Sequence, residues 1–262
     1  MKSALSGILV AFSMYSTIPV KQIPWQKSTM RWALSFLPII GLIIGLFEWL
    51  WYIFCTYFNA SPVFYSIIAA IIPIIISGGI HLDGLCDTCD ALCSFGDIEK
   101  KLTILKDAHI GAFGSMWLMV FLLFEIACFA QLYKTPKYLI FAFIGFSIAR
   151  AVGGSKIVLL PCAKNSGLAH IFSQNSDKKI VLFTLIFEAI LFLILTTLAI
   201  FNINNSILIS KFLICIVLIW YFIHNKLCKD IFGGITGDLA GFFICTTELI
   251  FLLVPTLGGM IL

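Results

Sequence analysis

Seven long apolar runs constrain this chain more than any other feature of its sequence. They cover residues 33–55, 62–80, 111–132, 139–161, 180–201, 207–223 and 241–261. Each approaches or exceeds the roughly 17–25 residues that a helix needs to cross the hydrocarbon core of a bilayer. None shows the strict alternation that is typical of a membrane barrel strand. Because 61% of the residues are hydrophobic and only 11% are charged, the sequence predicts an all-α, polytopic membrane helical bundle of about seven transmembrane helices. We expect residues 1–262 to form a single integral membrane domain.

The first twenty residues are apolar but differ from these seven runs. Several serines and a threonine interrupt residues 1–20, and Pro19 and Pro24 lie at or just beyond their end. No small-residue cleavage site follows, as it would in a signal peptide. We therefore expect a short re-entrant or interfacial helix here, with an eighth transmembrane span as the alternative.

Lys and Arg are distributed unequally over the segments that connect the runs. Seven spans place the N-terminus and residues 81–110, 162–179 and 224–240 on one side of the membrane. Twelve of the 17 Lys and Arg lie on that side and two on the other. Short cytoplasmic segments are enriched in these residues, so we expect the first side to face the cytoplasm. Nine of the 13 acidic residues lie in the same three segments, which predicts that the polar chemistry gathers at the cytoplasmic face.

Three aspartates follow the second run at helical spacing. Asp83, Asp87 and Asp90 are placed at i, i+4 and i+7, within about 60° of one another on one face of a helix. Three carboxylates this close repel one another unless a cation neutralises them. Mg²⁺ commonly binds a few carboxylates together with substrate phosphates and waters. We therefore predict a Mg²⁺ site on this helix. The alternative is a solvated acidic face paired with Lys100, Lys101 or Lys106.

Two glycine-rich stretches resemble each other. Gly78-Gly79 is expected to end the second span and to precede the acidic helix, with His81 as a contact to substrate or to a metal ligand. Gly233-Gly234-Ile235-Thr236-Gly237-Asp238 repeats the spacing from glycine pair to aspartate. Backbone N–H groups in such a turn suit phosphate oxygens, and Asp238 could add a metal ligand. A plain loop is the alternative.

Basic residues and two further glycines accompany these motifs. Gly111 and Gly114 indicate either tight helix packing or backbone approach to a ligand. Arg150 and Lys164 lie near the cytoplasmic end of another span, where they can pair with the acids or bind an anionic substrate, and we favour the substrate. Glu248 lies inside the last span, and an ionisable residue in a membrane is a functional hypothesis by default.

This set of motifs fits phosphoryl or nucleotidyl transfer. It combines carboxylates for a metal, glycine-rich turns and basic side chains at one membrane face. In such reactions catalysis is mostly positioning and charge neutralisation. The sequence contains no Walker motif, no Ser–His–Asp arrangement and no Rossmann fingerprint.

These motifs, in this order, make the sequence similar to the cobalamin synthase family (adenosylcobinamide-GDP ribazoletransferase). The family's acidic motif is matched by Gly78, Gly79, His81, Asp83, Gly84, Asp87 and Asp90. Its Lys-Asp-x-x-x-Gly-x-x-Gly element is matched by Lys106, Asp107, Gly111 and Gly114. Its later element is matched by Gly233, Gly234, Thr236, Gly237 and Asp238, with Glu248 following. His109 and Lys164 depart from the family, which usually has arginine at these positions.

The resemblance implies a Mg²⁺-dependent last step of cobalamin assembly. Adenosylcobinamide-GDP would react with α-ribazole, or its 5′-phosphate, and release GMP. The ribazole 3′-hydroxyl would attack the phosphorus next to the cobinamide arm, with Asp90 or Asp107 accepting the proton. We expect the metal ligands to be Asp83, Asp87, Asp90 and Asp238. The expected catalytic residues are Asp90, Asp107 and His81. The expected substrate contacts are Gly78, Gly79, Lys106, Gly111, Gly114, Arg150, Lys164, Gly233, Gly234 and Thr236.

Two other functions compete with this interpretation. A CDP-alcohol phosphatidyltransferase also uses aspartates at helical spacing, but its Asp-Gly-Ala-Arg is replaced here by Asp83-Gly84-Leu85-Cys86. A cation-coupled transporter is less favoured, because transporter sites usually lie near the bilayer midplane. The expected partners are the two substrates and the lipid bilayer of a bacterial or archaeal cell (inner) membrane. No nucleic acid is expected, and both a monomer and a homo-oligomer are compatible with the sequence.

Overall fold

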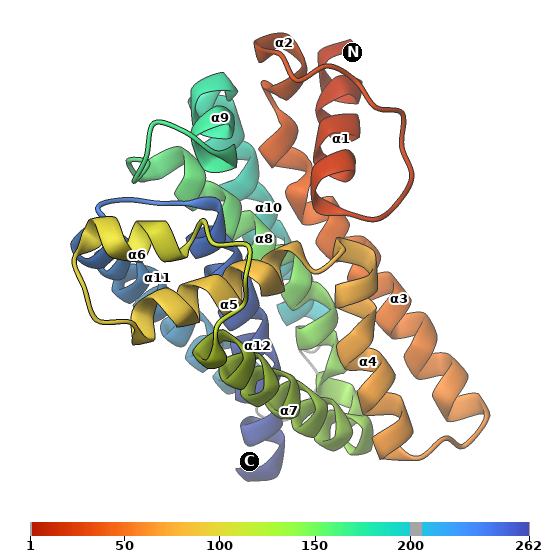
Figure 1. The fold of residues 1–262 in the computed structure, drawn as a ribbon. Helices are drawn as coiled ribbons and strands as arrows, with labels where there is room; N and C mark the ends of the chain where they lie inside the picture. Colours follow the sequence, from red (N-terminus) through yellow and green to blue (C-terminus); the bar gives the residue numbers. More distant parts are fainter. Residues whose placement is uncertain (1, 200–205, 262) are drawn as a thin grey trace.

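The computed structural model describes residues 2–199 and 206–261 and shows a bundle of helices (Figure 1). The helices in that part of the chain are α1 (Lys2–Tyr15), α2 (Lys27–Met30), η1 (Ala33–Phe36), α3 (Leu37–Tyr57), α4 (Pro62–Ser77), α5 (Ile80–Cys93), α6 (Ile98–Ile104), α7 (Ala112–Lys134), η2 (Pro136–Tyr138), α8 (Leu139–Leu159), α9 (Leu168–Asn175), α10 (Lys178–Ala199), α11 (Ser206–Phe232) and α12 (Gly237–Ile261). Among these residues, six helical segments are long and apolar enough to cross a membrane, and a bent helix pair can form a seventh crossing. The predicted all-α polytopic bundle is confirmed.

The second predicted span is this bent pair rather than one straight helix. Helix α4 ends at Ser77, and α5 leaves it at an angle of 98°. Gly78 and Gly79 form the corner with φ values of 69° and 75°, a left-handed conformation that glycine adopts without strain. The predicted break at the glycine pair is confirmed. Beyond it, α5 runs across α7 and α12 (Figure 1).

Helices α8 and α12 form the centre of the bundle. Of the most apolar stretch of α8, 83% is buried inside the protein, against 22% for α10. Helix α8 packs against α3, α10 and α12, while α12 also packs against α5 and α7. The outer helices expose their apolar side chains to the lipid, where a hydrophobic surface is stable.

Helix α11 is longer than its apolar run and extends into the connecting segment 224–240. The helix continues to Phe232, and α12 begins at Gly237. His224, Cys228 and Phe232 explain the extension, because they are spaced four apart and all three are buried on one face. Asp238 therefore lies in the first turn of α12 rather than in a loop. The predicted span 180–201 corresponds to α10, and its residues 200 and 201 lie outside the described residues.

The predicted short N-terminal helix is α1. Its 14 residues are too few for a transmembrane span, so no eighth span is found in the described part of the chain. Helix α1 packs against η1, α2 and α3. The segment after it is fixed to the end of α4, because Thr17 donates hydrogen bonds from its N–H to the Ile76 carbonyl at 2.9 Å and from its hydroxyl to the Ile75 carbonyl at 2.7 Å. The N-terminal segment thus lies beside the corner between α4 and α5.

Candidate functional site

The crossing of α5 and α12 places acidic residues from two helices in one site. A Cβ at Gly84 on α5 would lie 2.7 Å from the carbonyl oxygen of Asp238 on α12. A Cβ at Gly241 would lie 3.1 Å from the carbonyl oxygen of His81. Neither glycine carries a side chain, so the two backbones approach closely, as small residues allow in membrane bundles. Asp238 is thereby brought to the helix that carries Asp83.

The aspartates of α5 interact with one another and with the neighbouring acids rather than with lysines. Asp87 lies within electrostatic range of four other carboxylates: those of Asp83, Asp238, Asp90 and Asp107. Lys101 donates instead to the carbonyls of Ala91 at 2.7 Å and Ser94 at 2.8 Å, at the end of α5. In the described residues, ion pairs join Arg31 to Asp177, His109 to Asp107 and Arg150 to Glu248. The alternative of an acidic face paired with lysines is therefore not observed.

Asp90 has a structural partner that the sequence did not predict. Its two carboxylate oxygens accept hydrogen bonds from the backbone N–H groups of Gly111 at 2.7 Å and Gly114 at 2.9 Å. These amides lie at the start of α7, where helix N–H groups lack intrahelical acceptors and the helix dipole favours negative charge. A Cβ at Gly111 or Gly114 would lie 2.3 or 2.4 Å from an Asp90 oxygen. The glycine pair therefore admits the Asp90 carboxylate, while the predicted roles of the pair with substrate and of Asp90 with metal or proton stay predictions.

A short pairing of two loops brings Lys164 beside Asp238. The N–H of Ile235 donates to the Pro161 carbonyl at 2.8 Å, and the N–H of Ala163 donates to the Ile235 carbonyl at 3.0 Å. The amides of Gly233 and Gly234, predicted to contact phosphate, donate instead to carbonyls near the end of α11 at 3.2 and 2.9 Å. These two glycines thus end α11 and shape the loop rather than present free donors.

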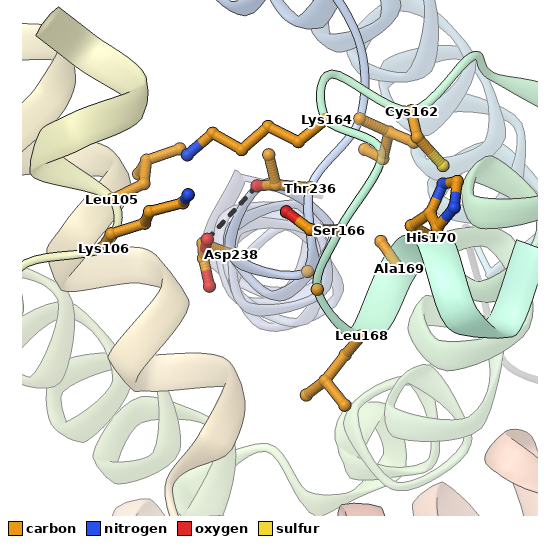
Figure 2. Close-up of a pocket in the computed structure, with 13 residues that line it drawn as sticks. Leu105, Lys106, Cys162, Lys164, Ser166, Leu168, Ala169, His170, Thr236 and Asp238 are labelled. Carbon is orange, nitrogen blue, oxygen red and sulfur yellow. Dashed lines mark hydrogen bonds between the residues drawn. The ribbon is translucent and has the colours of Figure 1, made fainter.

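The paired loops form one wall of a cavity of about 200 Å³, which we call the basic pocket. Its polar lining residues are Lys106, Lys164, Ser166, His170, Thr236 and Asp238. Figure 2 shows the ammonium groups of both lysines on one side of the pocket, beside Asp238, with His170 on the opposite side. The basic pocket is therefore lined by three predicted substrate contacts, Lys106, Lys164 and Thr236, and by one predicted metal ligand, Asp238.

The two lysines of the basic pocket influence each other. Burial lowers the pKa of the Lys164 ammonium group, the nearby charge of Lys106 lowers it further, and Asp238 opposes the shift. Lys164 also donates a hydrogen bond to the Leu102 carbonyl. Thr236 accepts a hydrogen bond from the N–H of Leu239 at 3.2 Å, which caps α12, and donates to Asp238 at 3.3 Å. Two like charges held close together favour an anion between or beside them.

A second cavity of about 250 Å³ adjoins the first, and we call it the apolar pocket. The two cavities share Leu168, Ala169, Gly237 and Asp238 as lining residues. The apolar pocket also contains His81 and Asp83 from α5 and Tyr15 from α1. Asp238 thus lies at the junction of the two cavities, while Asp83 and His81 line the apolar pocket alone of the two.

Arg150 lies apart from both pockets. It is 1% exposed inside α8, is ion-paired with Glu248 of α12, and donates to the Phe146 carbonyl at 2.9 Å. With His81 and Glu125, these two residues line a small cavity of about 20 Å³. Arg150 therefore has a buried carboxylate partner, and its predicted contact with substrate stays a prediction.

Asp107 is exposed, and its carboxylate is bound by the neighbouring residue His109. The N–H of His109 donates to its carboxylate at 3.0 Å, and the His109 ring nitrogen lies 2.8 Å from the same oxygen. These hydrogen bonds lower the pKa of the Asp107 carboxyl. A lowered pKa weakens a general base, so the structure adds no support to the predicted proton-accepting role of Asp107.

The carboxylates suit a hard cation by their chemistry. Asp83 is exposed, and Asp87 and Asp238 are half-buried, so none of the three carboxylates is fully enclosed by protein. In the part of the chain that the structure describes, no three acidic, His or Cys side chains form a ready-made metal cage. Mg²⁺ does not need such a cage, since it keeps waters and uses substrate phosphates as ligands. Asp83, Asp87 and Asp238 therefore fit Mg²⁺, and Asp90 fits it less well because both of its oxygens already accept hydrogen bonds.

Three lining residues were missed in the sequence. Ser166 and His170 lie beyond Lys164 in the basic pocket, and Tyr15 reaches the apolar pocket from α1. The polar stretch around Lys164 is a pattern from which Ser166 could have been found. Nothing in the sequence near Tyr15 indicates its contact with the ring of His81, at 6.1 Å between ring centroids.

Fold and site together define a multi-pass membrane protein with a polar, phosphate-compatible site at one end of its bundle. Residues 7–256 match the family described as Cobalamin-5-phosphate synthase. The chain belongs to this family.

Curated relatives agree with the family. The chain is 35% identical over 245 residues to an adenosylcobinamide-GDP ribazoletransferase of Lachnoclostridium phytofermentans, covering 94% of this chain and 91% of the relative. A protein of the same name from Clostridium botulinum (strain Alaska E43 / Type E3) is 34% identical, covering 95% and 96%. Another from Geobacillus sp. (strain WCH70) is 28% identical, covering 93% and 92%. No solved structure matches the chain. The family resemblance predicted from the motifs is confirmed, and these relatives carry the name of an enzyme.

Proposed function

We propose that this protein transfers the cobinamide-phosphate moiety of adenosylcobinamide-GDP to α-ribazole, or to its 5′-phosphate, and releases GMP. The reaction would require Mg²⁺ and would take place at the cytoplasmic face of a bacterial or archaeal cell (inner) membrane. The names of the relatives support the substrates. The observation that carries the proposal is the basic pocket, in which two lysines lie beside Asp238 and next to the aspartates of α5.

Different residues of the site bind the diphosphate of the donor and the metal ion. Lys106 and Lys164 bind the diphosphate of the donor, since they place two positive charges on one side of the basic pocket. Asp83, Asp87 and Asp238 would hold Mg²⁺, which neutralises phosphate charge when it is bound. The acceptor hydroxyl attacks the phosphorus next to the cobinamide arm, the bond from that phosphorus to GMP breaks, and the hydroxyl proton is released.

The test is GMP release from purified protein with adenosylcobinamide-GDP, α-ribazole and a Mg²⁺ titration. Asp83→Asn and Asp87→Asn keep the size of the side chain but remove its charge. We expect turnover to fall by at least about 10²–10³-fold, the effect of removing one strong electrostatic stabiliser. Asp230→Asn is the matched control, because Asp230 is exposed near the end of α11 and lines neither pocket.

The outcomes separate the parts of the proposal. A wild-type protein that releases no GMP contradicts the reaction itself. Near-normal turnover of Asp83→Asn and Asp87→Asn would leave the reaction standing but contradict the metal site.

A further inference from the structure

The apolar pocket differs in chemistry from the basic pocket that it adjoins. Among the described lining residues, only His81, Asp83 and Asp238 carry a charged or imidazole side chain, and the others are apolar, glycine or Tyr15. Its volume of about 250 Å³ is close to the lower end of the roughly 300–1,000 Å³ of small-ligand sites. Such sites are mostly apolar, with a few polar groups that orient the ligand. The pocket therefore suits a small, flat, largely apolar group.

The ring of His81, which lines this pocket, has one nitrogen without a partner among the described residues. His81 is 6% exposed, and its Nε2 makes no hydrogen bond to any described residue. A buried polar atom without a partner is costly unless a water or a ligand supplies one. The His81 ring is held in place by Tyr15, whose ring lies 6.1 Å away in a stacked arrangement and also packs on Phe172 at 5.7 Å. The His81 ring thus has a fixed place in the wall between the apolar pocket and the small cavity beside Arg150.

We propose that the apolar pocket binds the uncharged aromatic base of the acceptor nucleoside. This inference rests on the proposed function and assigns one substrate to each pocket. The base is enclosed by α1, α5, α8 and α12 and packs beside the ring of His81. The diphosphate of the donor lies in the basic pocket, and the two substrates meet at Asp238, which lines both.

The alternative occupant, the guanine of the donor, fits this pocket less well. Guanine carries hydrogen-bonding groups along several edges, and each would need a partner when buried. Among the described residues, the apolar pocket provides polar side chains at His81, Asp83, Asp238 and Tyr15, and the two aspartates are shared with the predicted metal site. A benzimidazole has one free ring nitrogen and is otherwise apolar. We therefore expect the guanine of the donor to lie on the side of the basic pocket.

The test uses one substitution in each pocket and a matched control. Ile80 begins α5, is half-buried and lines only the apolar pocket. Ile80→Ala should raise the KM for α-ribazole about tenfold, the effect of removing apolar contact from a binding pocket, and leave the KM for the donor unchanged. Lys106→Ala should do the reverse. Ile72→Ala is the control, because Ile72 is half-buried against the same core and lines none of the cavities described.

A binding measurement makes the result independent of turnover. Equilibrium dialysis of α-ribazole with detergent-purified protein, without donor, should show weaker binding to Ile80→Ala than to the wild type or to Ile72→Ala. Ile157→Val removes one methyl group from the facing wall on α8 and should weaken binding in the same direction, should Ile80→Ala prove unstable.

The outcomes distinguish this inference from the proposed function. An active wild type whose Ile80→Ala variant changes the KM for the donor, or neither KM, overturns the inference and leaves the function intact. An inactive wild type that still binds α-ribazole, more weakly after Ile80→Ala, contradicts the function but supports the pocket. Equal binding of α-ribazole to all variants overturns the inference in either case.

Discussion

Gly84 on α5 and Asp238 on α12 are in backbone contact, at a point where a Cβ would lie 2.7 Å from a carbonyl oxygen. This contact sets the distance between the acidic helix and the first turn of α12. It also fixes Asp238 at the junction of the basic and apolar pockets. The geometry of the site therefore depends on Gly84, a residue without a side chain that could take part in the reaction.

Gly84→Ala should separate the two helices. The added methyl group meets backbone atoms of Asp238, which cannot rotate away as a side chain can, so we expect a loss of at least about 1–3 kcal/mol in stability together with a loss of GMP release. The measurement is the melting temperature in detergent. Gly237→Ala is the control for stability, since no atom lies within 4 Å of its Cβ position. Equal melting temperatures for the two variants would contradict the close approach.

Asp90→Asn should destabilise the protein. Asn keeps one carbonyl oxygen but turns an NH₂ group toward an N–H of Gly111 or Gly114, so one helix donor of α7 loses its acceptor. Capping interactions of this kind contribute about 0.5–2 kcal/mol, and we expect a loss in this range by thermal unfolding. Asp83→Asn is the matched control, because Asp83 is exposed, and its melting temperature should not fall. Lost turnover with an unchanged melting temperature for Asp90→Asn would instead place Asp90 in the chemistry.

Arg150 and Glu248 should depend on each other for stability. Removing one member of a buried ion pair leaves an uncompensated charge, which costs about 3–5 kcal/mol, whereas replacing both is often nearly neutral. We expect Arg150→Met and Glu248→Met to reduce the yield of folded protein and the double variant to recover much of it. Arg31→Met is the control, because the Arg31–Asp177 pair is more exposed and such pairs contribute about 0–1 kcal/mol. A folded Arg150→Met protein with a raised KM for the donor would favour the substrate contact predicted from the sequence.

The orientation of the bundle can be tested with inserted tags. The bias of Lys and Arg predicts that residues 94–97 and 162–166 face the cytoplasm. Tags there should be protected in right-side-out vesicles, and a tag at residues 58–60 should be accessible from outside. Accessibility of the tag at 94–97 from outside would reverse the orientation and place the site on the outer face.

Much of the fold was readable from the sequence, because membrane insertion depends on local properties. The length of an apolar run decides whether a helix can cross a bilayer, and the pair Gly78-Gly79 marked the corner between α4 and α5. Helical spacing likewise placed Asp83 and Asp87 on one face of α5. These features need no information from distant parts of the chain.

The partners of individual side chains were decided by the tertiary structure. Arg150 and Glu248 are 98 residues apart, and neither their pairing nor the bond from Asp90 to the start of α7 follows from spacing. In helices that are apolar on all sides, periodicity does not show which face meets which neighbour. Only the packing of α5 on α12, and of the loop after α8 on the turn before α12, brings Asp83, Lys164 and Asp238 together. The chemical groups of the site were thus evident in the sequence, whereas their arrangement depends on close backbone contacts between helices.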